Sequence, residues 1–455
     1  MEYLAGHIVA VPYPGRGHIN PMMNVCRLLA SRGILVTFIV TEEWLGLLSS
    51  DPKPPNLHLQ SIPNVLPSET SRGANYKEFF EAVYTKMEAP FEQVLDGLQR
   101  PITGILADFF LYWVVAVGCR RQIKVFSLCA PAVSWFAIQY HFDLLASNGH
   151  LPADIAERGD ERVDCIPGIS TRISDLPTNC FSTYSTPIVL EAVSWVTKAQ
   201  CLLFSSFYEL EPDLVDHLKE NLPIPIYPVG PSIPYMIAQE MPMKSMYHNQ
   251  EANHYMAWLD SQPRSSVLYI SLGSFLPVSG QQMDEIRMGI QASGVRYLWV
   301  LRENSSKVSI KSDDMGWIIP WCEQLKVLCD PSVGGFLTHG GWNSTLEGVY
   351  AGVPMLAFPL SLDQFHNSKL IAEDWNIGLR IKKQAGEENV VKREVITKFV
   401  QMLMDTDGNK SKEMRVKAKN LQVKCHAALG DGGSSFANLN AFVKDMIGYG
   451  DCSSL

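Results

Sequence analysis

The sequence predicts an α/β fold made of two doubly wound parallel sheets. Two observations indicate it: short apolar runs alternate with longer segments of helical spacing, and the alternation stops at Pro231 and starts again at Ser266. Alternation of this kind places parallel strands in a sheet that helices cover on both faces. A chain of 455 residues is also too long for one ordinary core, so two domains are expected.

The first half of the chain contains six apolar runs that are short enough for buried strands. They lie at residues 8–11, 35–40, 102–107, 124–128, 201–205 and 226–229. Three longer segments place apolar residues at helical spacing. These expected helices are residues 20–32, 76–98 and 131–147. The stretch 149–185 breaks the pattern with three prolines, and long loops of this kind are usually functional or mobile.

The second half repeats the alternation after a break that is rich in proline and methionine and has no clear period. Strands are expected at residues 266–271, 297–301, 333–338 and 355–359, and helices at 283–292, 393–404, 410–428 and 434–447. We place an interdomain linker in the break. The expected parts are an N-terminal domain at 1–235, a linker at 236–253, a C-terminal domain at 254–430 and a final helical segment at 431–455.

The composition argues against several kinds of partner. The net charge is −9 and no lysine or arginine cluster occurs, which argues against nucleic acid or an anionic membrane as a partner. No apolar segment is long enough to span a bilayer, and no basic leader precedes the first strand. The ten cysteines show no CxxC and no metal spacing. We therefore expect a cytoplasmic monomer without stable membrane insertion.

The residues between 321 and 364 are the most informative part of the chain. The apolar run 333–337 predicts a buried strand, and Gly340 and Gly341 after it allow a sharp turn. A helix that follows such a turn offers free N–H groups and a positive dipole end, which favour a phosphate. His339 stands at the end of the strand, where open α/β sheets bind ligands.

The residues after the turn suit the start of the expected helix. Asn343, Ser344 or Thr345 can cap it, and Glu347 fits the preference for an acid in the first turn. This short segment therefore predicts where the anion site lies.

Further side chains of the same stretch suit the other parts of a nucleotide sugar. Trp321 offers a flat face for a base, and Glu347 can accept hydrogen bonds from two ribose hydroxyls. Asp363 and Gln364 place a carboxylate beside an amide, a pair suited to sugar hydroxyls. The alternative is one more strand and helix of the sheet, which explains the apolar residues but not the polar ones gathered at loop ends.

A histidine lies between the first strand and the first helix, on the ligand side of the sheet. His18 can act as a general base because its unperturbed pKa lies near neutrality. Asp108 follows another apolar strand at the same edge and can hold the imidazole tautomer. The alternatives are a helix-start histidine with a structural hydrogen bond and an aspartate that caps a helix.

Three weaker signals complete the survey. The GxG at 15–17 lacks the third glycine of a dinucleotide fingerprint, so NAD binding is poorly supported. Ser274 follows an expected strand and is a candidate phosphate ligand. The DxD at 405–407 has a spacing that often holds a metal, but it follows a helix and is expected to be a solvated helix end. We expect no metal site.

Residues 321–364 closely resemble the signature box of the plant family-one UDP-glycosyltransferases. The resemblance rests on residues at the family's spacing: Trp321, Gln324, His339, Trp342, Asn343, Ser344, Glu347, Asp363 and Gln364. The segments 17–22 and 433–435 also look like the family, so the similarity covers essentially the whole chain. Two positions depart from the pattern, Asp330 where the family usually has histidine and Gly340 where it usually has cysteine.

The resemblance implies the GT-B architecture, two facing Rossmann-like domains with a cleft between them and a last helix that crosses back to the first domain. It also implies which residues bind each part of the donor, UDP-glucose. Trp321 would stack on uracil, and Gln324 and Glu347 would bind the ribose. The diphosphate would be bound by His339, Asn343, Ser344 and Ser274, and the sugar by Trp342, Asp363 and Gln364. Cys322, beside Trp321, is counted with the donor-binding residues. His18 is the implied base and Asp108 its partner.

The function that the resemblance implies is an inverting transfer of glucose from UDP-glucose to a hydroxyl or carboxyl of a small hydrophobic acceptor, giving a β-glucoside. No cofactor and no metal are expected. The acceptor is expected near His18 and the aromatic residues at 109–113 and 132–141. One alternative, motivated by Gly340 and Asp330, is a UDP-sugar-binding protein with weak or no catalysis. Another, resting on the GxG alone, is an NAD-dependent oxidoreductase.

Overall fold

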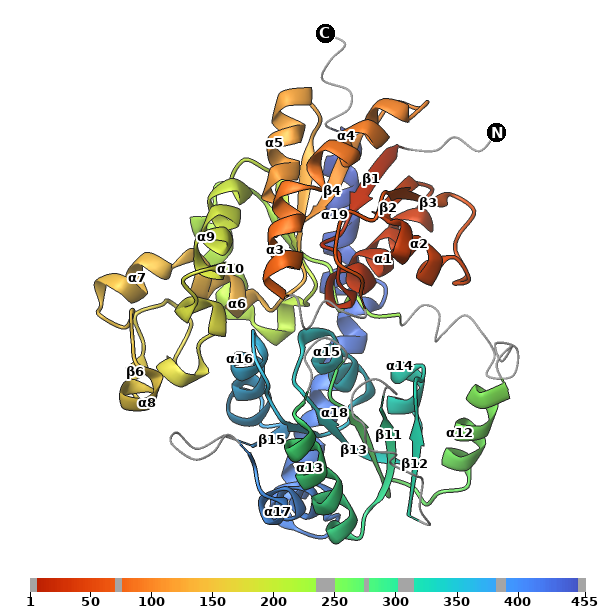
Figure 1. Cartoon of the computed structure of the whole chain (residues 1–455), viewed down its shortest axis with the longest axis vertical. Helices are drawn as coiled ribbons and strands as arrows, with labels where there is room; N and C mark the ends of the chain where they lie inside the picture. The colour runs from red at the N-terminus through yellow and green to blue at the C-terminus, as the bar shows by residue number, and fades with distance from the viewer. Residues whose placement is uncertain are drawn as a thin grey trace.

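The computed structural model describes residues 6–69, 76–234, 250–273, 278–301, 315–381 and 390–448. They form two α/β domains, each built on a parallel sheet and stacked one above the other (Figure 1). Ser274 and most of the expected linker at 236–253 lie outside the described residues. Within the described part of the chain, no helix is both long and apolar enough to cross a bilayer.

The N-terminal sheet has the strand order β3-β2-β1-β4-β5-β8-β9, and all its neighbouring strands are parallel. Its strands are β1 (His7–Val11), β2 (Leu35–Thr41), β3 (Leu57–Ile62), β4 (Gly104–Asp108), β5 (Val125–Cys129), β8 (Cys201–Phe204) and β9 (Ile226–Pro228). The order reverses between β1 and β4, so the loops after these two strands diverge and leave a place for a ligand.

The helices of this domain pack on both faces of the sheet. They are α1 (Arg16–Ala30), α2 (Glu42–Leu48), α3 (Tyr76–Thr85), α4 (Glu88–Gly97), α5 (Tyr112–Arg121), α6 (Val133–Tyr140), α7 (Phe142–Ser147), α9 (Ser185–Val196) and α10 (Pro212–Asn221). The single helix expected at 76–98 is two helices. Pro90 stands in the first turn of α4, and because it has no N–H it cannot continue a helix from α3.

Residues 149–184, which we call the insert, separate α7 from α9. The insert contains the short helix α8 (Ile155–Arg158), the antiparallel pair β6 (Arg162–Val163) and β7 (Thr171–Arg172), and two 3₁₀ turns, η1 (Ile173–Asp175) and η2 (Thr178–Phe181). It belongs to the N-terminal domain by sequence, but it extends down beside α16 (Gln364–Lys369) of the C-terminal domain (Figure 1).

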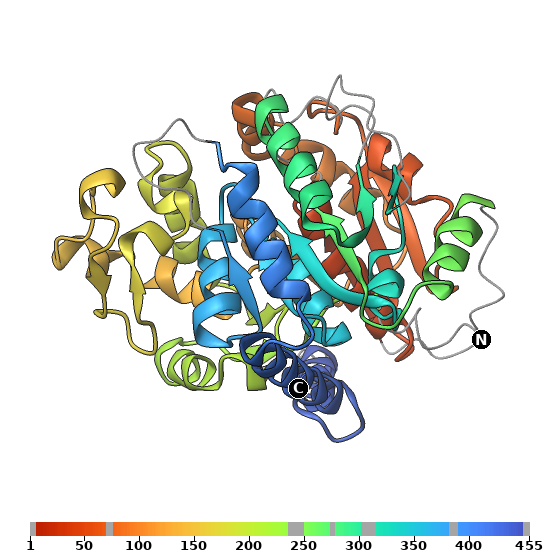
Figure 2. The same cartoon turned by 90° about the horizontal axis from the view of Figure 1, so that it is seen from below.

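The C-terminal sheet has the strand order β12-β11-β10-β13-β14-β15, again parallel throughout. Its strands are β10 (Val267–Ser271), β11 (Arg296–Val300), β12 (Gly316–Ile319), β13 (Val333–Thr338), β14 (Met355–Ala357) and β15 (Gly378–Arg380). The remaining helices are α12 (Gln250–Asp260), α13 (Gly280–Ser293), α14 (Gln324–Leu328), α15 (Trp342–Ala351), α17 (Arg393–Met404), α18 (Asn409–Leu429) and α19 (Ser434–Gly448). Seen from below, α13 and α17 lie side by side across this sheet (Figure 2).

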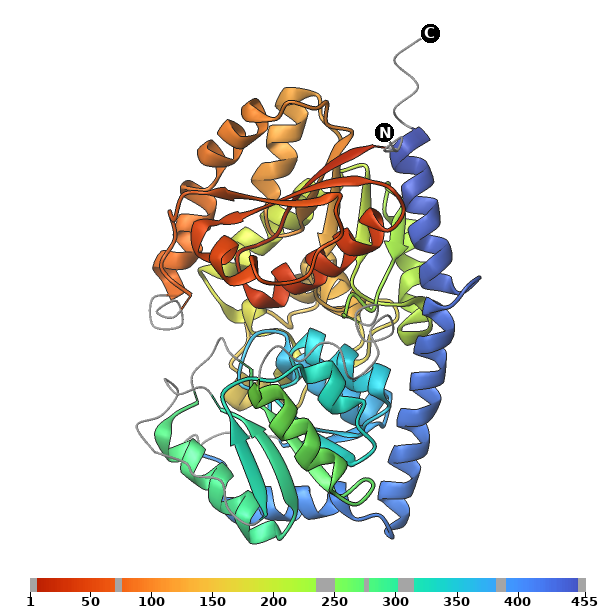
Figure 3. The ribbon, with the colours of Figure 1, turned by 90° about the vertical axis from the view of Figure 1, so that its right-hand side faces the viewer.

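The last two helices run along the side of the molecule, α18 beside the C-terminal domain and α19 beside the N-terminal one (Figure 3). Phe442 of α19 is 1% exposed, and its ring lies 5.2 Å from that of Phe126 on β5. Ser435 Oγ donates to the carbonyl of Gly230 at 2.5 Å, and the Asn438 side chain donates to that of Pro228 at 2.9 Å. The end of the chain therefore completes the core of the domain that the start of the chain forms.

This packing predicts that a change near the C-terminus destabilises the N-terminal domain. Phe442→Ala removes a fully buried ring and is expected to lower the free energy of unfolding by about 3–5 kcal/mol. Val423→Ala, at a position 59% exposed on α18, is the control and is expected to change it by less than about 0.5 kcal/mol. Urea unfolding followed by circular dichroism measures both. A loss below about 1 kcal/mol for Phe442→Ala would contradict the packing.

Candidate active site

His18 and Asp108 meet at the carboxyl edge of the N-terminal sheet. The loop after β1 leads into α1, which carries His18 in its first turn, and the neighbouring strand β4 ends at Asp108. His18 Nδ1 lies 2.9 Å from Asp108 Oδ2, and the other carboxylate oxygen accepts from the backbone N–H of Phe110 at 3.1 Å. Asp108 is 1% exposed, so its orientation is fixed, and it holds the imidazole with Nε2 as the remaining nitrogen.

The surroundings of His18 favour its charged form. Burial lowers the pKa of His18, but the charge of Asp108, the hydrogen bond to it and the charge of Asp363 outweigh burial, and the pKa is raised. The ring packs between Tyr13, at a centroid distance of 5.1 Å, and Phe110, at 5.4 Å. A proton taken up by this imidazole is therefore stabilised by two carboxylates.

The first turn of α15 forms an open helix N-terminus. Gly341 is its cap residue and offers no side chain, and no acidic residue stands in the first turn. The expectation that Asn343, Ser344 or Thr345 caps this helix and that Glu347 lies in its first turn is wrong, because α15 begins at Trp342 and places Glu347 in the second turn. The free N–H groups and the dipole therefore face outward without a competing carboxylate, as an anion requires.

His339 lies beside this helix start, against two glycines. A Cβ built on Gly273 would lie 2.8 Å from His339 Nε2, and one built on Gly341 would lie 2.5 Å from it. Both positions therefore require glycine. Burial lowers the pKa of His339 to about 4, so the ring is neutral at pH 7 and can serve a phosphate as a hydrogen-bond donor. A hydrogen bond with the backbone of Ser271 raises the pKa of His339 and offsets only part of the effect of burial.

The two unusual residues of the stretch leave this arrangement intact. Gly340 has a φ of +79°, which favours glycine, and a Cβ there would find only ordinary contacts, the nearest at 3.5 Å. Asp330 Oδ1 accepts from the N–H and the hydroxyl of Ser332 at 2.8 and 2.6 Å, and so closes the turn before β13. The six residues of β13 separate Asp330 from His339 by about 20 Å.

The residues expected to bind the uracil and the ribose of the donor include a hydrogen-bonded group. Trp321 is 57% exposed and presents its ring to solvent. Gln324 Nε2 donates to Glu347 and, at 3.1 Å, to Ser344 Oγ, while its oxygen accepts from the hydroxyl of Tyr269 at 3.1 Å. Burial raises the pKa of Glu347 to about 7, against the hydrogen bond from Gln324, which lowers it.

The Cys322 side chain contacts this group from its buried side, at Tyr269. It is 6% exposed, and its Sγ lies 3.3 Å from the hydroxyl of Tyr269 in the core. Burial raises the pKa of the Cys322 thiol to about 12, so it stays protonated.

Two of the residues expected at the sugar lie at the start of α16, where Asp363 is the N-cap and Gln364 is the first helical residue. Asp363 Oδ2 accepts from Asn367 Nδ2 at 2.7 Å, and Asp363 is close enough to His18 for each charge to influence the pKa of the other. Gln364 Oε1 accepts from the N–H groups of Leu360 and Ser361 at 2.8 and 3.2 Å. The oxygen of Gln364 therefore holds the loop itself.

Two hydrogen bonds connect the start of α15 with the N-terminal domain. Asn343 Nδ2 donates to the carbonyl of Gly17 at 3.0 Å, and Trp342 Nε1 donates to the carbonyl of Ser205 at 2.8 Å. Trp342 is 4% exposed, so its indole serves the domain contact rather than an open sugar site. The carboxyl ends of the two sheets therefore face each other, and His18 lies next to the anion site.

The sequence reasoning missed several residues that organise the site. Tyr269 joins the ribose group, and the carbonyls of Gly17 and Ser205 receive the two bonds from α15. Asn367 donates to the carbonyl of Gly340 at 2.9 Å as well as to Asp363. Only Asn367 left a signal in the sequence, since it stands four residues after Asp363, a spacing that brings side chains together at a helix start.

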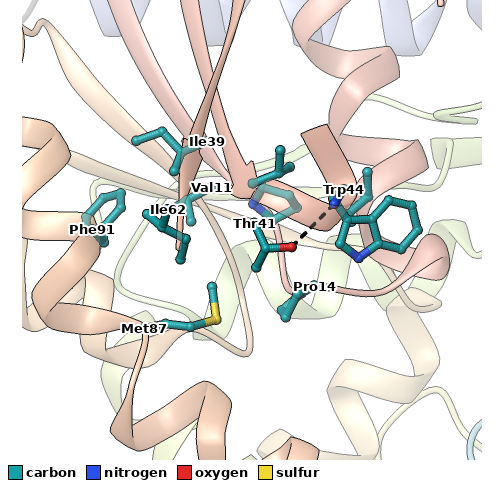
Figure 4. A pocket seen from close by; sticks show the side chains of 11 residues that line it. Val11, Pro14, Ile39, Thr41, Trp44, Ile62, Met87 and Phe91 are labelled. Atoms are coloured by element: carbon teal, nitrogen blue, oxygen red, sulfur yellow. Dashed lines mark hydrogen bonds between the residues drawn. The ribbon is translucent and has the colours of Figure 1, made fainter. Parts of the chain in front are cut away.

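A small apolar cavity lies behind the loop that carries His18 (Figure 4). Its walls include Pro14, Ile39, Trp44 and Met87, and Thr41 accepts from the N–H of Trp44 at 3.4 Å. The cavity volume of about 10 Å³ is room for about one water molecule. The cavity is therefore too small to be a substrate site.

The fold and the site together define a class of protein. Two facing parallel-sheet domains hold an anion site on one side and a histidine–aspartate pair on the other. This is the arrangement of a GT-B glycosyltransferase, which takes its sugar from a nucleotide diphosphate.

Comparisons with known proteins agree. The family model described as "UDP-glucoronosyl and UDP-glucosyl transferase" matches residues 227–415, and that described as "Glycosyltransferase, N-terminal domain" matches residues 6–45. UDP-glycosyltransferase 87A2 of Arabidopsis thaliana is 45% identical over 448 residues, covering 97% of this chain and 96% of that protein. The 7-deoxyloganetin glucosyltransferase of Catharanthus roseus is 31% identical, covering 96% of each chain.

Solved structures show the same fold. That of Phytolacca americana UGT2 complexed with UDP-2fluoro-glucose and pterostilbene matches with a TM-score of 0.80 and 25% identity, covering 97% of this chain and 99% of that one. That of Os79 from O. sativa in complex with U2F and trichothecene gives 0.81 and 25%, covering 96% of this chain and 100% of that one. The chain belongs to the plant family-one UDP-glycosyltransferases and is an enzyme of this class.

The pKa of Glu347 predicts that donor binding depends on pH. A carboxylate accepts two ribose hydroxyls better than a protonated acid does, and the raised pKa means that the free protein takes up a proton as the pH falls through about 7. UDP-glucose affinity is therefore expected to be constant above pH 7 and to fall by up to about tenfold per unit below it.

Calorimetry with UDP-glucose between about pH 5.5 and about pH 8.5 measures this dependence. Glu347→Gln is the matched control: it binds more weakly throughout but is expected to show a flat profile. Equal slopes in the wild-type protein and the variant would contradict the assignment of Glu347.

Proposed function

We propose that this enzyme transfers glucose from UDP-glucose to a hydroxyl or carboxyl of a small hydrophobic acceptor, with inversion and without a metal. The single observation that carries the proposal is the 2.9 Å contact of His18 with the buried Asp108, next to the helix N-terminus of the other domain. This geometry pairs a base for the acceptor with an anion site for the leaving group.

The proposed reaction is one displacement. His18 Nε2 takes the proton of the acceptor hydroxyl while the acceptor oxygen forms a bond to the anomeric carbon, and the bond from that carbon to the diphosphate oxygen breaks. Asp108 stabilises the imidazolium that forms. The base stands on the N-terminal domain and the leaving group on the C-terminal one, so the oxygen arrives opposite the bond that breaks. An α-linked donor then gives a β-glucoside.

UDP gains negative charge as it leaves, and the chain offers donors for that charge. The first-turn N–H groups of α15 and the Asn343 side chain are fixed before the reaction, because α15 is anchored to Gly17 and Ser205. Preorganised hydrogen-bond donors of this kind typically lower the activation barrier by about 3–4 kcal/mol each. His339 adds a neutral hydrogen-bond donor. No step of the proposed reaction is assigned to a metal.

The region around His18 suits a flat apolar acceptor. Aromatic rings follow one another across it: Phe110 lies 5.9 Å from Tyr13 and 5.4 Å from Trp135, and Tyr84 is stacked on Tyr112 at 5.4 Å. These rings form an aromatic cluster beside the base, and within the described part of the chain no group is hydrogen-bonded to the buried Tyr84 hydroxyl. An aromatic or terpenoid alcohol, or a carboxylic acid of similar shape, has the matching chemistry.

Glucose as the donor sugar is supported by two kinds of observation. Gln364 closes the sugar loop in a stretch whose final glutamine goes with UDP-glucose in this family. Two relatives at 31% identity are named as glucosyltransferases, one of them a flavonol 7-O-beta-glucosyltransferase from Arabidopsis thaliana.

The described cysteines are all unpaired, in keeping with the cytosol as the place of action.

The alternative, a UDP-sugar-binding protein without useful catalysis, is less well supported. This alternative rests on two residues that depart from the family pattern, Gly340 and Asp330. The turn at Gly340 keeps a relaxed glycine conformation, and Asp330 serves the opposite edge of the sheet. Asp330 accepts from Ser332, and the N–H and carbonyl of Gly340 bond to Thr338 and Asn367.

The proposal predicts that His18→Ala separates the two acceptor types. A hydroxyl must lose its proton during attack, so turnover with phenolic or aliphatic alcohols is expected to fall about a hundredfold to ten-thousandfold. A carboxylic acid is already ionised at neutral pH, so its transfer is expected to fall much less. UDP release from UDP-glucose, assayed with a chelator in every reaction, measures both.

Calorimetry with UDP is the control in this experiment, and the affinity of His18→Ala for UDP is expected to match that of the wild-type protein. Undiminished turnover of alcohols by the variant would refute His18 as the base. Loss of all turnover on chelation in the wild-type protein would refute the metal-free reaction.

A further inference from the structure

The insert contacts the C-terminal domain along one line beside α16 and β15. Lys369 Nζ donates to the carbonyl of Ser170 at 2.6 Å. Arg380 donates two hydrogen bonds to the Asp175 carboxylate, at 2.6 and 3.1 Å, and both side chains are buried. A buried, doubly hydrogen-bonded ion pair is costly to break, so the insert is firmly attached at this point.

The third contact on this line reaches the loop that carries Asp363. Thr178 Oγ1 accepts from the N–H of Leu362 at 2.9 Å, and the N–H of Thr178 donates to the carbonyl of Leu362 at 3.1 Å. Leu362 immediately precedes Asp363. One residue of the N-terminal domain thus binds both backbone groups of a residue in the expected sugar site.

Leu362 needs such support because of its conformation. Its φ is +62°, a left-handed backbone that a branched residue adopts only when its surroundings enforce it. On the other side of the loop, Gln364 Oε1 binds the N–H groups of Leu360 and Ser361. The loop is therefore fixed from within its own domain by Gln364 and from the opposite domain by Thr178.

We propose that Thr178 is a positioning residue that sets the sugar loop at residues 360–364 and so determines how tightly the enzyme holds the sugar of its donor. The inference rests on the proposed function, because it takes Asp363 and Gln364 as the residues that face the sugar. Thr178 touches neither the donor nor the acceptor in this account and acts through Leu362.

This role makes a specific prediction about which part of the donor is affected. The uridine and diphosphate sites are assigned to Trp321, Gln324, His339 and the first turn of α15, whereas the hydrogen bonds of Thr178 go to Leu362 and, at 3.5 Å, to Ser361 on the loop that leads to Asp363. Thr178→Val removes the acceptor for the Leu362 N–H but keeps the shape of the side chain and the Asp175–Arg380 attachment. It should therefore weaken UDP-glucose binding and leave UDP binding unchanged.

The experiment compares two dissociation constants, for UDP-glucose and for UDP, by calorimetry on the full-length protein. Thr178→Val is expected to raise the Kd for UDP-glucose about threefold to tenfold, the usual loss for one hydrogen bond, and to leave that for UDP within about twofold. Thr178→Ser keeps the hydroxyl and is expected to restore the wild-type values. Thermal unfolding of each variant shows that it is folded.

Thr183 provides the matched control, since it is an exposed threonine of the same insert. Thr183→Val is expected to change neither constant. Equal weakening of UDP and UDP-glucose by Thr178→Val would mean that the contact only holds the domains together, and it would overturn the inference. So would unchanged binding of both ligands.

Failure of the proposed sugar site would show differently, in a second variant. If Asp363→Ala leaves the ratio of the two dissociation constants unchanged, the assignment of the sugar site itself is refuted. If Asp363→Ala alters the ratio and Thr178→Val does not, the sugar site stands and only the role of Thr178 is refuted.

Discussion

The proposed active site depends on the contact between the first turn of α15 and the first turn of α1, which carries His18. The Asn343 amide bound to the carbonyl of Gly17 and the Trp342 indole bound to the carbonyl of Ser205 join the carboxyl ends of the two sheets. Neither domain alone has both a base and an anion site. The insert and α19 add further attachments between the domains, so the position of His18 relative to the diphosphate site is fixed from several sides.

The electrostatics of the two halves are complementary. The C-terminal half places neutral hydrogen-bond donors at the proposed diphosphate site, because burial lowers the pKa of His339 to about 4 and no acid stands in the first turn of α15. The N-terminal half presents carboxylates to the imidazole, where Asp108 and Asp363 raise the pKa of His18. In the proposed reaction, carboxylates therefore stabilise the proton that moves to His18, and hydrogen-bond donors stabilise the negative charge that develops on UDP.

Much of the fold follows from the sequence because buried parallel strands read as apolar runs. Within the two large sheets, the strands that the sequence did not reveal are β3, β12 and β15. All three are at sheet edges, where β3 alternates buried and exposed residues and β15 has only three residues, one of them Arg380. The pairing of His18 with Asp108 could be predicted, since both follow apolar strands at one sheet edge. The site geometry that depends on side-chain direction could not.

Cys322 and Trp342 illustrate that limit, because both stand at expected donor positions yet turn their side chains to Tyr269 and to Ser205. Thr178 illustrates another, since its role depends on the left-handed backbone of Leu362, a residue far away in the sequence. Contacts between domains leave no periodic pattern in a single chain, so only the folded structure brings such pairs together.

The stereochemistry of the product tests the central claim most directly. If the base and the leaving group act from opposite domains in one displacement, UDP-glucose, whose sugar is α-linked, gives only the β-glucoside. Proton NMR of the purified product distinguishes the anomers by the coupling of the anomeric proton, which is large for the diaxial β form. A small coupling, indicating the α-glucoside, would contradict a single displacement between His18 and the first turn of α15.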